Sequence, residues 1–211
     1  MKVIGINGSP HERGCTYTAI ELMAKELEKE KIEVEILQIG KKPFQGCTAC
    51  NACGKMEDPK CIFGNDLVNE CIEKMKSADG IILGSPTYYA AIAGPMKCFL
   101  DRFFYAGSHV LKHKVGVAVA SQRRTGGVEV TQQINNYFNL AHVVIPPSQY
   151  WNTIHGNTPA EAMQDLEGVQ IMQTLGKNMA WTMKSLKAGS ERVDLPILEP
   201  RVWTNLIRKS E

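Results

Sequence analysis

Short apolar runs alternate along the chain with longer segments of helical periodicity. The apolar runs end at turn-forming residues, as KVIGIN does before Gly-Ser-Pro, and this is typical of buried strands. In the helical segments apolar side chains recur every three or four residues, and residues 16–31 place Ile20, Met23 and Leu27 on one face. The pattern predicts five strands, at residues 2–7, 34–39, 80–84, 115–120 and 143–145, and five helical segments, at residues 16–31, 65–77, 95–105, 128–140 and 159–187.

The order of these elements predicts an α/β fold with a doubly wound, five-stranded parallel sheet. Strands that alternate with helices form parallel sheets covered on both faces. Right-handed crossovers then give the strand order 2-1-3-4-5 of the flavodoxin type. Ligands bind such sheets at the carboxyl ends of the strands, beside the point where the order reverses. We therefore expect the loops after strands 1, 3 and 4 to form one site, with the cysteine-rich loop after strand 2 on the same edge.

Two parts of the chain differ in composition. Residues 1–187 carry the alternating pattern and are predicted to form one domain, which includes the cysteine-rich loop 46–61. Residues 188–211 are rich in turn formers and charge, yet they contain Leu195, Ile197 and Trp203. Apolar side chains in a tail usually pack on a surface, so we expect this tail to contact the same subunit or a neighbouring one.

Composition narrows the classes of protein that remain. The 211 residues are 44% hydrophobic and 22% charged, with a formal net charge of +2. A chain of this length buries enough core to fold without disulfides. The near-neutral charge gives no electrostatic footprint for nucleic acid, and no run approaches the roughly 18 apolar residues of a membrane span. The N-terminus also lacks a signal-peptide pattern. We expect a cytoplasmic protein with neither nucleic acid nor membrane as a partner.

Four of the seven cysteines, Cys47, Cys50, Cys53 and Cys61, are clustered with the spacing C-x2-C-x2-C-x7-C. Thiolates this close in sequence can converge on one soft metal centre, and the first three match the start of a bacterial ferredoxin run. We predict a [4Fe–4S] cluster. A structural zinc site is an alternative, although zinc sites usually combine two separated C-x2-C pairs. Thiols without a metal are the third possibility.

The loop after the first strand has features of a phosphate site. Residues 8–18, GSPHERGCTYT, bring the hydroxyls of Ser9, Thr16 and Thr18 and the guanidinium of Arg13 to a helix start. Backbone N–H groups at such a start, together with hydroxyl donors, suit a terminal phosphate. The loop is neither a P-loop nor a G-x-G-x-x-G loop. An ordinary helix start is the alternative interpretation.

The loops after the third and fourth strands suit a flat ring system. Residues 85–97, SPTYYAAIAGPMK, place two adjacent tyrosines at a strand end, where a ring could lie against backbone and tyrosine. Tyrosines at a rim or a subunit contact are the alternative. Residues 121–129, SQRRTGGVE, contain Gly126 and Gly127, which allow a backbone to approach a ligand closely.

Together these loops resemble the NADPH-dependent FMN reductase family. The segments SPHERGCTYT, PTYY with the following GPMKCFLDR, and the loop containing GG occur in the order and spacing of that family over residues 1–186. With the cysteine run added, the chain resembles the iron–sulfur flavoprotein branch. The resemblance implies a flavodoxin-like fold, FMN as cofactor, a [4Fe–4S] cluster near the flavin, and a homodimer or homotetramer.

The resemblance also implies which residues bind FMN. These are, for the phosphate, Ser9, Arg13, Thr16 and Thr18; for the ring, Pro86, Thr87, Tyr88, Tyr89 and Ala90; and for the far side of the ring, Ser121, Gly126 and Gly127. Cys15 stands where relatives commonly carry Asn, which removes an amide from the phosphate loop and leaves its backbone donors. We expect no side chain to act as a nucleophile or general base.

The predicted function is that of an FMN-dependent oxidoreductase. It would move electrons from NAD(P)H or ferredoxin to a small-molecule acceptor, such as a quinone, an aromatic compound or oxygen, through FMN and the cluster. One alternative is a non-enzymatic carrier that shuttles electrons between protein partners. The net charge of +2 argues against the acidic docking surface of such a carrier. The other alternative is a plain NAD(P)H-dependent FMN or quinone reductase without a cluster.

Overall fold

A sheet of order β2-β1-β3-β5-β6, with a short β4 paired to β3, runs through the protein. The structure is a computed structural model that describes residues 1–41, 43–200, 202 and 204. The strands are β1 (Lys2–Asn7), β2 (Glu33–Gln38), β3 (Gly80–Tyr88), β4 (Ala91–Ile92), β5 (Val115–Gln122) and β6 (Thr153–His155). The helices are α1 (Cys15–Lys29), α2 (Leu67–Ser77), α3 (Gly94–Gly107), α4 (Gly127–Leu140), α5 (Pro159–Ala162) and α6 (Leu166–Gly189), with short 3-10 turns η1 (Cys53–Lys55) and η2 (Ser108–Val110).

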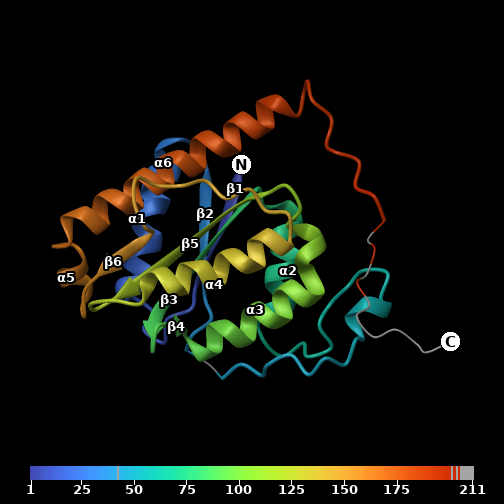
Figure 1. The fold of residues 1–211 in the computed structure, drawn as a ribbon, viewed down its shortest axis with the longest axis horizontal. Coiled ribbons are helices and arrows are strands. Elements are labelled where there is room, and N and C mark those ends of the chain that lie inside the picture. Colours follow the sequence, from blue (N-terminus) through green and yellow to red (C-terminus); the bar gives the residue numbers. More distant parts are fainter. Residues whose placement is uncertain (42, 201, 203, 205–211) are drawn as a thin grey trace.

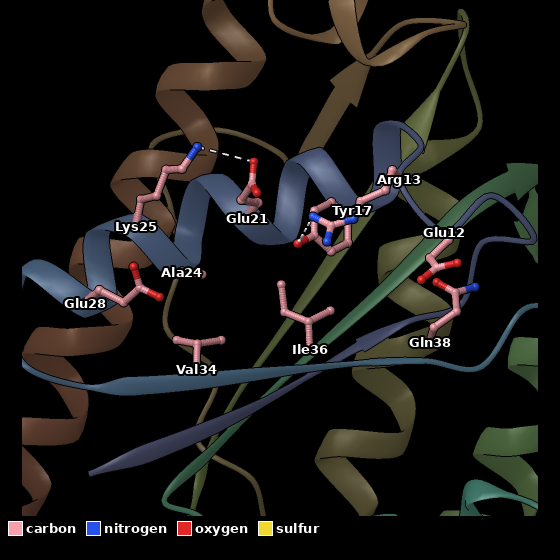
Figure 2. A pocket seen from close by; sticks show the side chains of 10 residues that line it. All are labelled: Glu12, Arg13, Tyr17, Glu21, Ala24, Lys25, Glu28, Val34, Ile36 and Gln38. Carbon is pink, nitrogen blue, oxygen red and sulfur yellow. Dashed lines mark hydrogen bonds and ion pairs between the residues drawn. The ribbon is translucent and has the colours of Figure 1, made fainter.

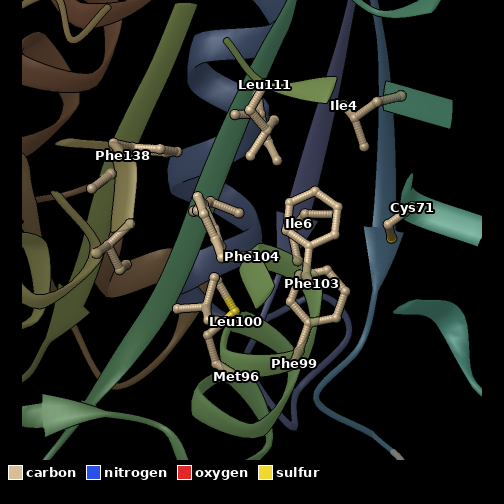
Figure 3. Packing of buried hydrophobic residues seen from close by; sticks show 14 of the residues in the cluster. Ile4, Ile6, Cys71, Met96, Phe99, Leu100, Phe103, Phe104, Leu111 and Phe138 are labelled. Carbon is tan, nitrogen blue, oxygen red and sulfur yellow. The ribbon is translucent and has the colours of Figure 1, made fainter. Parts of the chain in front are cut away.

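Helices cover both faces of the sheet (Figure 1), with α1 and α6 on one face and α2, α3 and α4 on the other. Successive residues of a strand point to opposite faces, so Ile81 and Leu83 of β3 enter one core and Ile82 enters the other. The face that carries α3 holds most of the buried phenylalanines (Figure 3). There Phe99 and Phe103 stack with their ring centroids 5.2 Å apart. This packing fixes α3 against the sheet.

The predicted order of the five parallel strands is confirmed, because β2, β1, β3, β5 and β6 lie side by side in that order and all pair in parallel. The sequence did not predict β4. It pairs antiparallel with the end of β3, which extends four residues beyond the predicted strand. Over the residues that the structure describes, the sheet therefore has six strands in place of the predicted five.

The predicted position of the last strand is wrong. Val144 forms only an isolated bridge to Val115, and β6 lies later in the chain. Pro146 and Pro147 follow closely, and proline has no N–H with which to continue a ladder. Parallel pairing with β5 resumes only at Thr153, beside Ala120.

The final helical region is two helices, where the sequence predicted one. The break falls before α6 because Asp165 caps that helix, accepting a hydrogen bond of 3.0 Å from the Gly168 N–H. Beyond α6, Leu195 and Ile197 are exposed in the single chain, so contact of the tail with a neighbouring subunit stays a prediction. Trp203 lies outside the described residues. No described helix is both long enough and apolar enough to cross a membrane.

Candidate functional site

A cleft of about 580 Å³ opens at the carboxyl ends of the strands, enclosed by the loops that follow β1, β3, β5 and β6. The predicted site residues that line it are Ser9, Arg13, Cys15, Thr16, Pro86, Thr87, Tyr88 and Ser121. The predicted residues that do not line it are Thr18, Tyr89, Ala90, Gly126 and Gly127. The three predicted loops thus meet in one place, as expected for this sheet order.

The start of α1 forms one end of the cleft. Gly14 precedes the helix and no side chain among the described residues caps it, so within that part of the chain the first N–H groups of α1 lack a side-chain acceptor. Arg13 lies beside them, and its guanidinium donates to the Tyr17 hydroxyl (2.6 Å) and lies 4.4 Å from the centre of that ring (Figure 2). Burial raises the pKa of the Cys15 thiol, which keeps this helix start free of an added negative charge. An anion is favoured here.

The floor of the cleft joins two loops through hydroxyl groups. The Thr16 and Ser121 oxygens are 2.8 Å apart and both residues are buried. Thr18 does not reach the cleft, since residues two apart on a helix do not face the same way. Its hydroxyl instead donates to the Gly14 carbonyl at 3.2 Å, which holds the first turn of α1. Thr18 thus stabilises the helix start in this structure, and its assignment to the ligand stays a prediction.

The β3–β4 hairpin forms the opposite wall. Tyr88 and Ala91 pair across a two-residue turn, Tyr89–Ala90, in which both residues have positive φ, 51° and 56°. Such turns favour Asn-Gly, so this one carries backbone strain that neighbouring contacts must offset. The Tyr89 side chain points fully into solvent. Both turn residues shape the wall without lining the cleft.

One hydroxyl group at this wall is buried. The Thr87 oxygen is buried and makes no hydrogen bond within the described residues. Buried polar atoms in native proteins are almost always satisfied. A bound ligand with a polar group at this position would satisfy it. This fits the predicted FMN, whose ring carries carbonyl and N–H groups.

The two glycines after β5 join loops and do not contact the cleft. Gly126 has φ of 94°, and a Cβ added there would lie 3.0 Å from the Ala90 Cα and 3.0 Å from the Thr87 Cγ2. The Gly127 N–H donates to the Gln122 side-chain oxygen at 2.6 Å. The glycines therefore let the loop after β5 pack closely against the β3–β4 hairpin. The sequence pattern predicted a close approach of backbone, and it did not show whether the neighbour would be a ligand or another loop.

A hydrogen-bonded chain supports the far wall. The Gln122 amide nitrogen lies 2.9 Å from His155 Nε2, and His155 Nδ1 lies 2.8 Å from the Asp165 carboxylate. An amide nitrogen can only donate, so Nε2 accepts and Nδ1–H donates to Asp165. Burial alone would raise the pKa of Asp165, but hydrogen bonds from Gly168 and His155 lower it overall. This chain holds Gln122 in the cleft wall.

Sequence reasoning missed several residues that build the cleft. Asn7 accepts from the Ser9 N–H at 3.1 Å and donates to the Glu12 carbonyl at 3.1 Å, which ties both sides of the phosphate loop together. Residues 156–159 also line the cleft. Gln122 and Asp165 gave no distinct signal in the sequence, except that Asp is a preferred N-cap.

Replacing Asp165 with alanine is expected to lower the free energy of unfolding by about 1–2 kcal/mol at pH 7, because the cap of α6 is lost. The folded pKa of Asp165 lies below its ordinary 3.8, so its contribution is complete above about pH 4 and is lost as the pH falls through the folded pKa. Urea unfolding between pH 7 and pH 2 measures this, with the exposed Asp194→Ala as the control. If the difference in unfolding free energy between the wild type and Asp165→Ala were the same at pH 2 as at pH 7, the role of the ionised Asp165 as the cap of α6 would be contradicted.

The four clustered cysteines line one cavity, together with Arg102 and Tyr105 of α3. Cys47 and Cys50 are exposed, and Cys53 and Cys61 are half-buried. In the described part of the chain, no group of three or more His, Cys, Asp or Glu side chains is placed to hold one metal ion. A single ion needs its ligands within about 2.3 Å of one point, whereas each thiolate of a four-iron cluster binds its own iron. The observation that supports a cluster is that all four cysteines line the same cavity.

Hydrogen-bond donors and strained backbone surround this cavity. Ala49 and Asn51, on either side of Cys50, have positive φ of 52° and 58°. The Tyr105 hydroxyl donates to the Asn51 side chain at 2.8 Å. Burial raises the pKa of the Cys53 thiol, and N–H groups of Gly54 and Cys53 itself partly offset this. The cysteine loop is thus a defined structure held on α3.

The cysteine cavity lies away from the cleft, and the two share no lining residue. The loop begins at the cleft edge, where Gly40 packs on Ser9, and then follows α3 to its other end. A Cβ added at Gly8 would meet Met96 near the start of α3, whereas Tyr105 holds the cysteine loop. These α3 positions are nine residues apart, or about 13 Å. The expectation that both sites share one edge is wrong for the cysteines.

The fold and the cleft together define a flavodoxin-like α/β protein. The chain matches the family described as NADPH-dependent FMN reductase over residues 1–158. An iron–sulfur flavoprotein of Methanocaldococcus jannaschii is 37% identical over 196 residues, covering 89% of this chain and 100% of that protein. An iron–sulfur flavoprotein of Methanosarcina thermophila is 30% identical over 198 residues, covering 91% and 100%. The chain belongs to the NADPH-dependent FMN reductase family, in the iron–sulfur flavoprotein branch, which confirms the resemblance.

Solved structures share the fold at low sequence identity. RosB with bound 8-demethyl-8-formylriboflavin-5'-phosphate aligns with a TM-score of 0.67 at 16% identity, covering 100% of this chain and 95% of that one. A flavodoxin from the domain Archaea aligns with a TM-score of 0.59 at 17% identity, covering 87% and 99%. These likenesses confirm the predicted flavodoxin-like fold.

Proposed function

We propose that the chain is an FMN-dependent oxidoreductase whose flavin binds in the cleft at the carboxyl ends of the strands. The observation that carries this proposal is the open N-terminus of α1 inside that cleft. It faces a wall that holds the Thr87 hydroxyl, which has no hydrogen-bond partner in the described part of the chain. One end of the cleft therefore suits a phosphate and the other a polar ring, and FMN has both. The RosB structure contains a flavin phosphate of the same general form.

Named residues would hold each part of FMN. Ser9, Arg13 and the first N–H groups of α1 would bind the phosphate, while Thr87 and Tyr88 would lie against the ring. When bound, FMN accepts two electrons as a hydride and releases them one at a time, whereas an iron–sulfur cluster carries one. No side chain of the cleft is needed as a nucleophile. The protein contributes orientation and hydrogen bonding.

We propose that the four clustered cysteines hold a [4Fe–4S] cluster. Support comes from the shared cavity and from the N–H donors of Arg102 and Gly54 that reach the sulfurs of Cys61 and Cys53. The cavity is small, about 20 Å³, so the exposed segment with Cys47 and Cys50 must move outward to admit a cluster. Zinc is the alternative metal, and elemental analysis distinguishes it from an iron–sulfur cluster.

The electron donor is proposed to be NAD(P)H or ferredoxin, and the acceptor a small molecule such as a quinone. Tyr88, at the rim of the cleft, is 45% exposed, so a small molecule can reach the proposed ring site from solvent. We also propose a homodimer or homotetramer, because Tyr150, Trp151 and Trp181 are exposed in the single chain. Sedimentation of the purified protein measures the assembly, and a monomer would contradict it.

One anaerobic preparation tests the cofactors and the reaction. We expect flavin absorption, iron and sulfide near four per chain, and steady-state reduction of a quinone by NADPH or NADH. A preparation that contains flavin, with zinc or with no metal, would rule out the cluster and leave the proposal of an FMN reductase. Flavin and cluster without nicotinamide-dependent turnover would favour ferredoxin as donor, or a pure electron carrier. A protein without flavin would overturn the proposal.

A further inference from the structure

Arg102 of α3 is a fully buried cation at the cysteine cavity. Only 1% of its surface is exposed, and it belongs to the same helix as the core residues Phe99 and Phe103. A buried charge is costly unless it is paired and hydrogen-bonded. Its partners therefore indicate what this side chain does.

Among the described residues, every hydrogen-bond partner of the Arg102 guanidinium belongs to the cysteine loop or its end. Nε donates to the Cys61 sulfur at 3.2 Å. The terminal nitrogens donate to the Gln45 carbonyl at 3.3 Å, to the Phe63 carbonyl at 2.7 Å and to both oxygens of Asp66. Gln45 precedes the first clustered cysteine and Phe63 follows the last. One planar side chain thus closes the loop without any metal.

Cys61 is held from a second direction. Its backbone N–H donates to the Asn69 side chain at 2.9 Å, and the Asn69 amide returns a hydrogen bond to the Cys61 carbonyl at 2.8 Å. Asp66, the partner of Arg102, also caps α2 by accepting from the Val68 N–H at 3.1 Å. The backbone of Cys61 is therefore fixed on α2, and its sulfur is fixed on α3.

We propose that Arg102 is the positioning residue of the metal centre. It directs the Cys61 sulfur into the cavity before a metal binds, and its cation stabilises the reduced state of the bound cluster. This rests on the proposed function, in which the cysteines hold a [4Fe–4S] cluster. Reduction adds one electron from an external donor, with no bond broken, and the added negative charge lies beside a fixed N–H donor. Hydrogen bonds to cluster sulfurs and nearby charge set the potential in this way.

The variants must separate positioning from simple unfolding. Arg102→Met alone leaves the half-buried Asp66 carboxylate without its partner, so we pair it with Asp66→Asn, which still caps α2. Arg102→Lys keeps the charge but not the planar fork. Lys97→Met is the control, since it removes a cation from the same helix that pairs with Asp101 and does not line the cysteine cavity. Circular dichroism checks that each variant folds.

The first measurement titrates reduced, metal-free protein with Cd²⁺ and follows the thiolate-to-cadmium absorption. We expect the double variant to bind Cd²⁺ at least tenfold more weakly than the wild type, Arg102→Lys to fall between them, and Lys97→Met to match the wild type. Equal Cd²⁺ affinity in the folded double variant would overturn the positioning role. If the wild type bound Cd²⁺ but held no iron, the proposal of a [4Fe–4S] cluster would be overturned. The proposal that Arg102 positions Cys61 would still be supported.

The second measurement is a redox titration of the iron-loaded proteins with dithionite, followed by the loss of cluster absorption. The double variant lacks the Asp66 charge as well as the Arg102 cation, so it is compared with Asp66→Asn alone. We expect the ratio of reduced to oxidised cluster at a fixed potential to be at least tenfold lower in the double variant than in Asp66→Asn, which is 59 mV for one electron. Arg102→Lys should shift less. A double variant with normal iron content and the potential of Asp66→Asn would overturn the electrostatic part of the proposal.

Discussion

Replacing Gly40 with alanine is expected to weaken FMN binding at least a hundredfold. A Cβ at this position would lie 2.2 Å from the backbone carbonyl oxygen of Ser9 and 2.6 Å from that of Gly8, so the backbone of the phosphate loop must shift. The Gln38 side chain donates a hydrogen bond of 2.6 Å to the same Ser9 carbonyl and would be displaced with it. A hundredfold loss corresponds to about 2.8 kcal/mol. Fluorescence titration of the apoprotein with FMN measures the change.

Gly189→Ala is the matched control, because a Cβ there meets nothing within 4 Å. We expect it to bind FMN as the wild type does. The iron content of Gly40→Ala should stay near that of the wild type, since the cysteine cavity shares no lining residue with the cleft. Wild-type FMN affinity in Gly40→Ala would show that the loop after β2 does not position the phosphate site.

Replacing Cys61 with serine is expected to remove most of the iron while leaving the flavin in place. Cys61 is the cysteine whose sulfur and backbone are both held, by Arg102 and by Asn69. Serine is a much weaker ligand for iron in a cluster than a thiolate, so we expect at least a tenfold loss of bound iron after gel filtration. Iron analysis and the flavin absorption band, read on the same sample, give both quantities.

Cys98→Ser is the control for this substitution. Cys98 lies beside the loop, with its sulfur 3.8 Å from a Cβ added at Gly46, but it does not line the cavity. We expect its iron content to equal that of the wild type. If Cys61→Ser kept its iron and Cys98→Ser lost it, the fourth ligand would be Cys98.

The sheet order could be predicted because it depends on a local pattern and a general rule. Alternating strands and helices with right-handed crossovers leave few topologies, and the observed order is the expected one. The misplaced strand shows where this reasoning stops. Residues 143–145 are apolar enough for a strand, yet the Pro146–Pro147 pair prevents the ladder from extending there. Which apolar segment pairs depends on the hydrogen bonds that its neighbours allow.

The candidate site was predicted at the level of loops more than of residues. Ser9, Thr16, Thr87 and Ser121 line the cleft because strand ends of a parallel sheet meet at one edge. Thr18 and Gly127 belong to the same loops but stabilise the chain itself. A sequence motif marks a loop as a whole and does not show which way each side chain points.

The sequence by itself determined the family, the class of fold and the loops that meet at the cleft, since each rests on residue types at fixed spacing. It also marked the four clustered cysteines. Only the tertiary structure decided where these cysteines lie. Their loop runs along α3 away from the cleft, and Arg102 holds it on that helix through hydrogen bonds. Contacts between Arg102 and Cys61, forty-one residues apart, leave no local pattern. They arise only when the helices pack on a common sheet and bring distant segments of the chain together.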